Sequence, residues 1–244
     1  MIPKVIHYCW FGGNPLPPLA EKCIVSWRKY LPDYEIRRWD ETNFDFGAHP
    51  YTKAAYEAGL YAFVSDYARF KILYENGGLY FDTDVEVIKP MDDIIEKGPF
   101  MGFENDGVNG TMAVAPGLGL AAEPEMELYH KILDSYDKLS FYDENGNRNP
   151  YSMIPMVTEL LVNAGLKGGC GVEKVAGVDV YPQCWFNPFD DATGRLRKTP
   201  DTRTIHWYSK SWMPKESTLA VWAKRLARRL LGGGFVSNIG KLIK

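Results

Sequence analysis

Short apolar runs alternate with longer segments of helical periodicity along the first half of the chain. Apolar or alternating runs predict strands at residues 5–10, 34–39, 79–81, 85–88, 100–103, 111–114, 178–181 and 202–207. Apolar positions at helical spacing predict helices at residues 17–31, 51–59, 60–76, 125–139 and 153–164. This alternation, followed by mixed elements, predicts an α/β domain with an antiparallel extension.

Two carboxylates follow the apolar strand predicted at residues 79–81. Asp82 and Asp84 stand at the carboxyl end of that strand, where open α/β sheets bind their ligands. On an extended segment both side chains point to one side and converge on one point, which requires a cation or a shared proton. Oxygen ligands favour Mg²⁺ or Mn²⁺. Two alternatives remain: a plain turn after a strand, or a phosphatase that uses Asp82 as its nucleophile.

A second pair of charges lies on the predicted helix that leads into this strand. Asp66 and Arg69 are three residues apart and therefore share one helix face. Taken alone, the pair is typical of an exposed ion pair that contributes well under about 1 kcal/mol.

Composition narrows the class of protein. The 244 residues are 45% hydrophobic and 24% charged, with 14% aromatics and a net charge of −3, so the whole chain gives no electrostatic case for nucleic acid as a partner. The four cysteines form no CxxC pair, which argues against a zinc site or a disulfide framework. The start lacks a signal-peptide core, and no apolar run reaches the roughly 20 residues of a membrane span. A cytoplasmic location is the expectation.

The last thirty residues differ in charge from the rest. Residues 215–244 carry seven basic side chains and one acid, so this tail has a charge of +6 and the rest of the chain −9. Apolar and basic positions fall on opposite arcs of a predicted helix. We therefore divide the chain into a domain at 1–214 and a basic amphipathic tail at 215–244. The tail either packs on the body with a solvated basic face or docks on an anionic inner-membrane surface.

Three ordered motifs between Ile2 and Trp212 carry a family resemblance. They are Ile2-Pro3-Lys4-Val5-Ile6-His7-Tyr8-Cys9-Trp10; Ser65-Asp66-Tyr67-Ala68-Arg69 followed by Gly77-Gly78-Leu79-Tyr80 and Asp82-Thr83-Asp84; and His206-Trp207-Tyr208-Ser209-Lys210-Ser211-Trp212. Together they resemble the DXD-containing sugar-nucleotide glycosyltransferases. That group includes yeast Golgi initiation mannosyltransferases, bacterial capsular polysaccharide transferases and, more distantly, clostridial toxin glucosyltransferases.

The resemblance implies a GT-A type α/β fold, a Rossmann-like mixed sheet flanked by helices, here with a C-terminal amphipathic helix. It also implies roles for individual residues. Trp10 would stack on the nucleotide base, and Asp66 and Arg69 would hold ribose, diphosphate or sugar. Asp82 would contact ribose or the metal region, and Asp84 and His206 would bind the metal. Ser211 and Trp212 would lie over the diphosphate. The polar segment at residues 103–109 offers Asn105, Asp106 or Asn109 to assist the reacting sugar, and His7 is expected in the core.

The implied activity is a Mn²⁺- or Mg²⁺-dependent, retaining transfer of a sugar from a UDP- or GDP-sugar donor. The implied acceptor is a growing surface or capsular glycan, lipid-linked and reached from the cytoplasmic face of the inner membrane. The phosphatase and a non-catalytic sugar-binding module remain as rivals.

Overall fold

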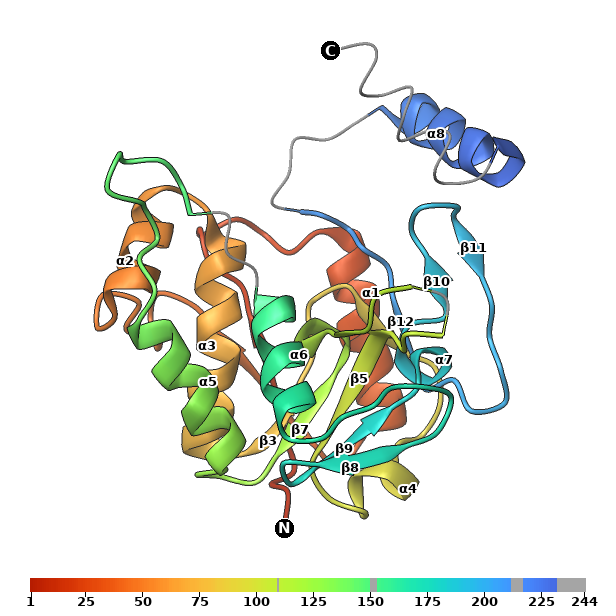
Figure 1. Cartoon of the computed structure of the whole chain (residues 1–244), viewed down its shortest axis with the longest axis horizontal. Coiled ribbons are helices and arrows are strands. Elements are labelled where there is room, and N and C mark those ends of the chain that lie inside the picture. The colour runs from red at the N-terminus through yellow and green to blue at the C-terminus, as the bar shows by residue number, and fades with distance from the viewer. Residues whose placement is uncertain (109, 150–152, 212–216, 232–244) are drawn as a thin grey trace.

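A mixed β-sheet forms the centre of the computed structural model, which describes residues 1–108, 110–149, 153–211 and 217–231 (Figure 1). Its strands follow the order β2-β1-β3-β7-β5-β9-β8, and β6 pairs with β5. Their bounds are β1 Val5–Cys9, β2 Glu35–Trp39, β3 Gly78–Tyr80, β5 Phe100–Asn105, β6 Ala113–Val114, β7 Leu120–Ala122, β8 Glu173–Val175 and β9 Val178–Tyr181.

The sheet is parallel where its first strands meet and mixed toward its other edge. β1 pairs in parallel with both β2 and β3, β7 joins β3 and β5 in antiparallel register, β5 and β9 are parallel, and β8 returns antiparallel to β9. Helices flank both faces. This arrangement confirms the predicted α/β fold class, a Rossmann-like mixed sheet flanked by helices. The short β7, absent from the sequence prediction, is the strand that joins the two parallel parts.

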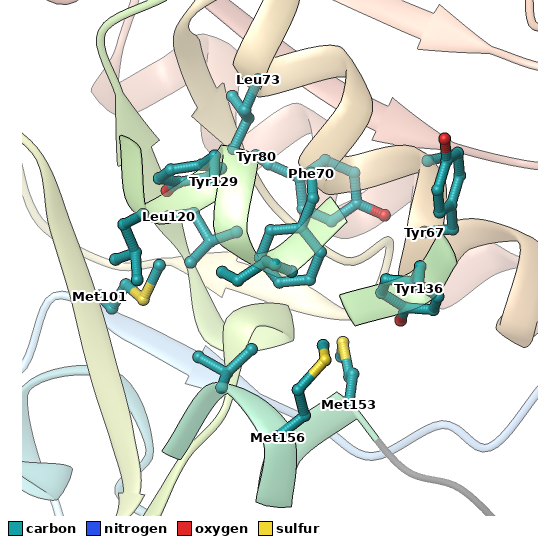
Figure 2. Close-up of a cluster of buried hydrophobic side chains, with 14 of the residues drawn as sticks. Tyr67, Phe70, Leu73, Tyr80, Met101, Leu120, Tyr129, Tyr136, Met153 and Met156 are labelled. Carbon is teal, nitrogen blue, oxygen red and sulfur yellow. The ribbon is translucent and has the colours of Figure 1, made fainter. Parts of the chain in front are cut away.

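The helices cover the sheet from two sides and enclose two cores. Helices α2, α3, α5 and α6 pack on one face, and α1, α4 and α7 pack on the other. Their bounds are α1 Pro18–Tyr30, α2 Pro50–Glu57, α3 Tyr61–Asn76, α4 Asp92–Ile95, α5 Glu127–Asp137, α6 Met153–Asn163 and α7 Gln183–Phe186. Figure 2 shows Phe70 of α3 and Tyr129 of α5 in the first core, beside Tyr80 of β3 and Met156 of α6.

The junction between α3 and β3 is built from two glycines and a buried histidine. Gly77 ends α3 at φ +63°, and Gly78 follows at φ +96°. A Cβ on Gly78 would lie 2.7 Å from the carbonyl oxygen of Val5, so β3 can approach β1 this closely only with glycine there. His7 is fully buried beside them. Its Nδ1 accepts a hydrogen bond from Trp39 Nε1 (3.0 Å), so its Nε2–H donates to the Gly77 carbonyl (3.0 Å).

A separate two-stranded ladder brings distant parts of the chain to the end of β3. Strand β4 (Val85–Val87) pairs antiparallel with β12 (Thr204–His206), and the register sets His206 opposite Val85. A hairpin of β10 (Phe189–Asp190) and β11 (Arg195–Leu196) lies beside α8 (Thr218–Leu231), as Figure 1 shows. α8 is the predicted tail helix; the domain division at residue 214 stays a prediction.

Several boundaries and short elements differ from the sequence prediction. The strand expected at 202–207 is limited to β12, because Thr202 turns back to bond Thr199 and the carbonyl of Cys184. Elements of two to four residues (α4, α7, β8, β10, β11) are too short to produce a periodic signal. All four cysteines are free. Within the described residues, no helix has the length and apolar character needed to cross a bilayer.

Candidate active site

A cavity of about 620 Å³ opens at the carboxyl ends of β1, β3 and β5. Its walls come from the loop after β1, the first half of α3, the turn after β3, the 3₁₀ turn at Pro116–Leu118, and residues 206–211. Most of the residues that the sequence singled out therefore line one space. They are Trp10, Asp66, Arg69, Asp82, Asp84, His206 and Ser211.

Arg69 connects the two motifs that lie on α3 and after β3. Its guanidinium bridges Asp66 Oδ1 (2.7 Å) and Asp82 Oδ1 (3.2 Å), while the group itself lies 4.9 Å from the ring centre of Tyr80. The Arg69 side chain is only 3% exposed, whereas the two carboxylates are 23% and 27% exposed to the cavity. The pair is therefore not the exposed helix ion pair that its spacing alone suggests. It is a fixed cation with two carboxylates at the cavity wall.

Gly117 sets the position of the Asp82 carboxylate. A Cβ at this position would lie 2.1 Å from Asp82 Oδ2 and 3.1 Å from Arg69 Nη1. The backbone N–H of Asp82 in turn donates to the Gly117 carbonyl (3.3 Å). Glycine is therefore required where the 3₁₀ turn passes the carboxylate.

Asp84 and His206 meet although 122 residues separate them in the chain. His206 Nε2 lies 3.0 Å from Asp84 Oδ1, and the backbone N–H of Ser209 donates to Asp84 Oδ2 (2.6 Å). The β4–β12 ladder produces this meeting, since Asp84 precedes β4 and His206 ends β12. The segment from Asp82 to Asp84 is a turn rather than an extended strand, and Asp82 and Asp84 have different partners.

Burial and pairing shift the titration of three of these groups. Burial opposes ionisation of Asp84, but His206 and the N–H of Ser209 outweigh it and lower its pKa to about 2. Burial lowers the pKa of His206, but the Asp84 carboxylate prevails and raises that pKa above 6.5. Burial raises the pKa of Asp66 to about 6, against the opposing charge of Arg69. The site thus favours an ionised Asp84 beside a histidine that holds a proton more tightly than usual.

The donor atoms fit a divalent cation that is shared with a ligand. Asp84 Oδ1 and His206 Nε2 face each other and supply one oxygen and one nitrogen. In the parts of the chain that the structure describes, no three His, Cys, Asp or Glu side chains group closely enough to hold a metal ion together. A cation at this pair would therefore need oxygens from a bound ligand and water to complete its coordination, which suits Mn²⁺ or Mg²⁺.

The other predicted residues have mixed outcomes. Trp10 lies at the cavity and its indole N–H donates to the carbonyl of Asn14 (2.7 Å). The side chains of Asn105 and Asp106 accept hydrogen bonds from the backbone of their own loop, and neither residue lines the cavity. Asn109 and Trp212 lie outside the described residues.

Sequence reasoning gave no role to three residues that line the cavity, namely Glu104, Tyr208 and Lys210. Tyr208 donates to Glu104 Oε1 (2.9 Å), Asn187 Nδ2 donates to the Tyr208 hydroxyl (2.8 Å), and Lys210 extends from the same loop. Glu104 stands near the end of a strand, as Asp82 does, and that position was a usable signal. No comparable signal marks Tyr208 and Lys210, whose backbones adopt φ +51° and +48° in a loop.

Comparison with known proteins identifies the segment that holds most of this site. The family described as "Glycosyltransferase sugar-binding region containing DXD motif" matches residues 17–101. Residues 17–101 are thus similar to a DXD-type glycosyltransferase region. Within that region lie Asp66, Arg69, Asp82 and Asp84, and His206 lies beyond it.

Relatives of the DXD-type glycosyltransferase region point to the same group. Inositol phosphoceramide mannosyltransferase 1 of Schizosaccharomyces pombe is 32% identical over 121 residues, which are 43% of this chain and 37% of that protein. An uncharacterised glycosyltransferase of Acanthamoeba polyphaga mimivirus is 28% identical over 109 residues, 41% of this chain and 42% of that protein. The chain thus spans about two fifths of the length of the curated relatives it matches.

A solved structure of a glycosyltransferase involved in the glycosylation of the major capsid of PBCV-1 has a TM-score of 0.46 with this chain. The two are 14% identical, and the match covers 86% of this chain and 95% of that one. A likeness at this level supports no inference about function.

Proposed function

We propose that the chain is a divalent-metal-dependent glycosyltransferase that moves a sugar from a UDP- or GDP-sugar donor to a glycan acceptor. The observation that supports this most is the meeting of Asp84 and His206 within the cavity that also contains Asp66, Arg69 and Asp82. Four of these five residues belong to the matched sugar-binding region. Oxygen and nitrogen donors beside a fixed guanidinium suit a ligand with two phosphates and several hydroxyls.

In this proposal each side chain has a distinct task. Asp84 and His206 would bind a Mn²⁺ or Mg²⁺ ion, which would neutralise the charge that develops on the departing diphosphate. Arg69 orients Asp66 and Asp82, whose cavity-facing oxygens accept hydrogen bonds from ribose or sugar hydroxyls. Trp10 offers an aromatic surface to the nucleotide base. Ser211 contributes to the diphosphate end of the cavity. The chain thus positions the donor and stabilises its leaving group, the largest contribution expected for such a reaction.

The proposal extends to stereochemistry and acceptor. We infer that the anomeric configuration is retained, as the resemblance to this family implies. No dedicated carboxylate nucleophile is then required, because the acceptor can attack from the leaving-group face, and both Asp82 and Asp84 already have strong partners. A growing surface or capsular glycan, lipid-linked, is the proposed acceptor. Asp82 as a phosphatase nucleophile is disfavoured on the same ground, since Arg69 and the Tyr80 hydroxyl (3.3 Å) both engage its carboxylate.

α8 supports a proposed association with a membrane surface. Its Trp222, Leu226 and Leu230 are 60%, 37% and 74% exposed, whereas Arg225 and Arg229 contact the β10–β11 hairpin. Among the described side chains of α8, these exposures and contacts favour membrane docking over an apolar face that packs on the body. No acidic residue occurs from 217 to 244, so the exposed apolar side chains lie in a wholly cationic segment that suits anionic lipid at the inner face of the membrane.

Donor turnover tests the proposed activity. The full chain is incubated with a panel of UDP- and GDP-sugars, with Mn²⁺ or with chelator, and nucleoside diphosphate release is measured. We expect release with at least one donor, loss of release on chelation, and loss of at least about a hundredfold in Asp84→Asn. Asp143→Asn, an exposed carboxylate in a surface turn, is the matched control and should behave as wild type. Hydrolysis of simple phosphate monoesters without donor turnover would instead favour the phosphatase.

Vesicle sedimentation tests the proposed membrane association separately. We expect binding to phosphatidylglycerol vesicles, little binding to phosphatidylcholine vesicles, and reduced binding when Trp222 and Leu230 are both replaced by Ala. Val25→Ala, which removes a 60% exposed apolar side chain from α1, should not change binding. Equal sedimentation of wild type with and without vesicles would contradict this part of the proposal.

A further inference from the structure

One carboxylate between β10 and β11 joins two elements that lie far apart in the chain. Asp191 Oδ2 accepts a hydrogen bond from Lys210 Nζ (2.6 Å), and its Oδ1 accepts one from Arg225 Nη2 (2.9 Å). Arg225 Nε also donates to the Asp191 carbonyl (3.1 Å). The Asp191 side chain is 26% exposed, so water screens these contacts only in part. Lys210 belongs to the cavity loop and Arg225 belongs to α8.

On the α8 side, arginines attach the helix to the hairpin. Arg229 donates from Nε to the Thr193 carbonyl (2.6 Å) and from Nη2 to the Gly194 carbonyl (3.1 Å). A Cβ on Gly194 would lie 2.8 Å from Arg225 Cδ, so the Arg225 side chain lies directly against the hairpin backbone. Asp191 is therefore part of a specific seat for α8, built from charge and backbone acceptors.

On the cavity side, the loop after β12 requires contacts of this kind. Tyr208 and Lys210 have φ values of +51° and +48°, a backbone conformation that side chains with a Cβ disfavour. Between them, the N–H of Ser209 donates to Asp84 Oδ2 (2.6 Å). Tyr208 is held by Glu104 and Asn187. At the other end of this strained turn, the contact with Asp191 holds Lys210.

A second line of contacts runs parallel to the first. The Arg225 guanidinium lies 5.5 Å from the ring centre of Phe189, and the Phe189 ring packs on Trp207 with centroids 5.3 Å apart. The backbone N–H of Trp207 donates to the carbonyl of Asp84 (3.0 Å). Arg225 therefore reaches the neighbourhood of Asp84 through both the charged contact and the aromatic contact.

We propose that Asp191 is a positioning residue of the donor site: by holding Lys210 and Arg225 together, it couples the seating of α8 to the loop conformation that supports Asp84. The effect on donor binding rests on the function proposed above; the coupling itself does not. Because such coupling is reciprocal, a ligand that orders the loop also favours the seated helix, and a surface that displaces α8 weakens the donor site.

The test compares the full-length wild type with Asp191→Asn, Arg225→Gln and Arg228→Gln. Arg228→Gln is the matched control, because it removes the same charge from an exposed arginine on the same helix. Amide hydrogen exchange at Ser209 measures the loop directly, without any substrate. We expect exchange about tenfold faster in Asp191→Asn and Arg225→Gln, and unchanged in Arg228→Gln. The amide of Ile6, deep in the sheet, should exchange equally slowly in all four proteins and shows that the fold is intact.

Steady-state kinetics provide the second readout. For a donor that the wild type uses with Mn²⁺, we expect KM to rise about tenfold in Asp191→Asn while kcat stays within about twofold. In this variant the loop would be disordered before the donor binds but ordered once it is bound. Wild-type Ser209 exchange in Asp191→Asn and Arg225→Gln would overturn the coupling whatever the activity. A wild type that turns over no nucleotide sugar would overturn the proposed function and leave the exchange result to decide the coupling.

Discussion

Replacement of Gly117 by Ala tests the Arg69–Asp82 contact without touching either charge. The added methyl group would lie 2.1 Å from Asp82 Oδ2, less than any tolerated contact, and 3.1 Å from Arg69 Nη1. The Asp82 carboxylate must therefore rotate away from the guanidinium or the 3₁₀ turn must move outward. Rotation of the carboxylate breaks the 3.2 Å contact between Arg69 and Asp82, and we expect it to dominate, because outward movement of the turn would break the hydrogen bond from the Asp82 N–H to the Gly117 carbonyl.

The expected magnitude follows from the burial of Arg69. Its side chain is 3% exposed, so the loss of one of its two carboxylate partners leaves a buried cation only half satisfied. A hydrogen bond to a charged group contributes about 1.5–3 kcal/mol, and we expect Gly117→Ala to lower the free energy of unfolding by about 2 kcal/mol. Displacement of Asp82 from the cavity wall should also weaken donor binding by about tenfold.

Urea unfolding and calorimetric titration with UDP or GDP in the presence of Mn²⁺ measure the two effects. Gly171→Ala is the matched control, because a Cβ there meets no atom within 4 Å. If Gly117→Ala unfolds and binds nucleotide as the wild type and Gly171→Ala do, then the close packing of Gly117 on Asp82 does not organise the site.

Three further predictions concern single side chains. Arg69→Lys, which cannot bridge Asp66 and Asp82 with a planar fork, should raise the donor KM by about tenfold in initial-rate assays; an unchanged KM would refute the bridging role. Because Asp84 holds the His206 pKa above 6.5, a proton competes with Mn²⁺ for His206 once the pH falls below that raised pKa. The apparent Mn²⁺ affinity in calorimetry should then fall by up to about tenfold per pH unit, and a flat profile would contradict this. Burial lowers the His7 pKa to about 4, so the unfolded chain binds a proton more readily than the folded chain. About 3 kcal/mol of the free energy of unfolding present above pH 6.5 should therefore be lost as the pH falls toward 4. In urea unfolding, His7→Gln should lack this dependence of the free energy of unfolding on pH.

The sequence predicts well those helices in which apolar residues recur along one face over several turns. Helix α3 is expected at 60–76 and begins one residue later, because its apolar spacing and its closing Gly77 leave little freedom. β7 is three residues long and lies in a Gly- and Pro-broken stretch, so its insertion between β3 and β5 has no local signal. The strand pairing that joins the two parallel parts of the sheet is therefore determined by tertiary contacts and not by local sequence.

The same distinction applies to the site. Asp82 and Asp84 stand out because they follow a buried strand, but the sequence predicted an extended segment and the structure has a turn. His206 gains its significance only from the β4–β12 register, which no spacing in the sequence encodes; the family motif pointed to it. Lys210 and Asp191 are partners that lie 19 residues apart in the chain, and ordinary loop composition does not mark them. Glu104 near the end of β5 did carry a positional signal, but its partner Tyr208 lies 104 residues away.

The position of a bound metal ion tests the central claim most directly. Crystals of the full chain grown with Mn²⁺ and UDP or GDP allow the ion to be located by its anomalous scattering. The account predicts one strong peak within about 2.5 Å of both Asp84 and His206 Nε2 and in contact with the diphosphate oxygens. A nucleotide bound with its metal elsewhere, while Asp84 and His206 still contact only each other, would contradict it.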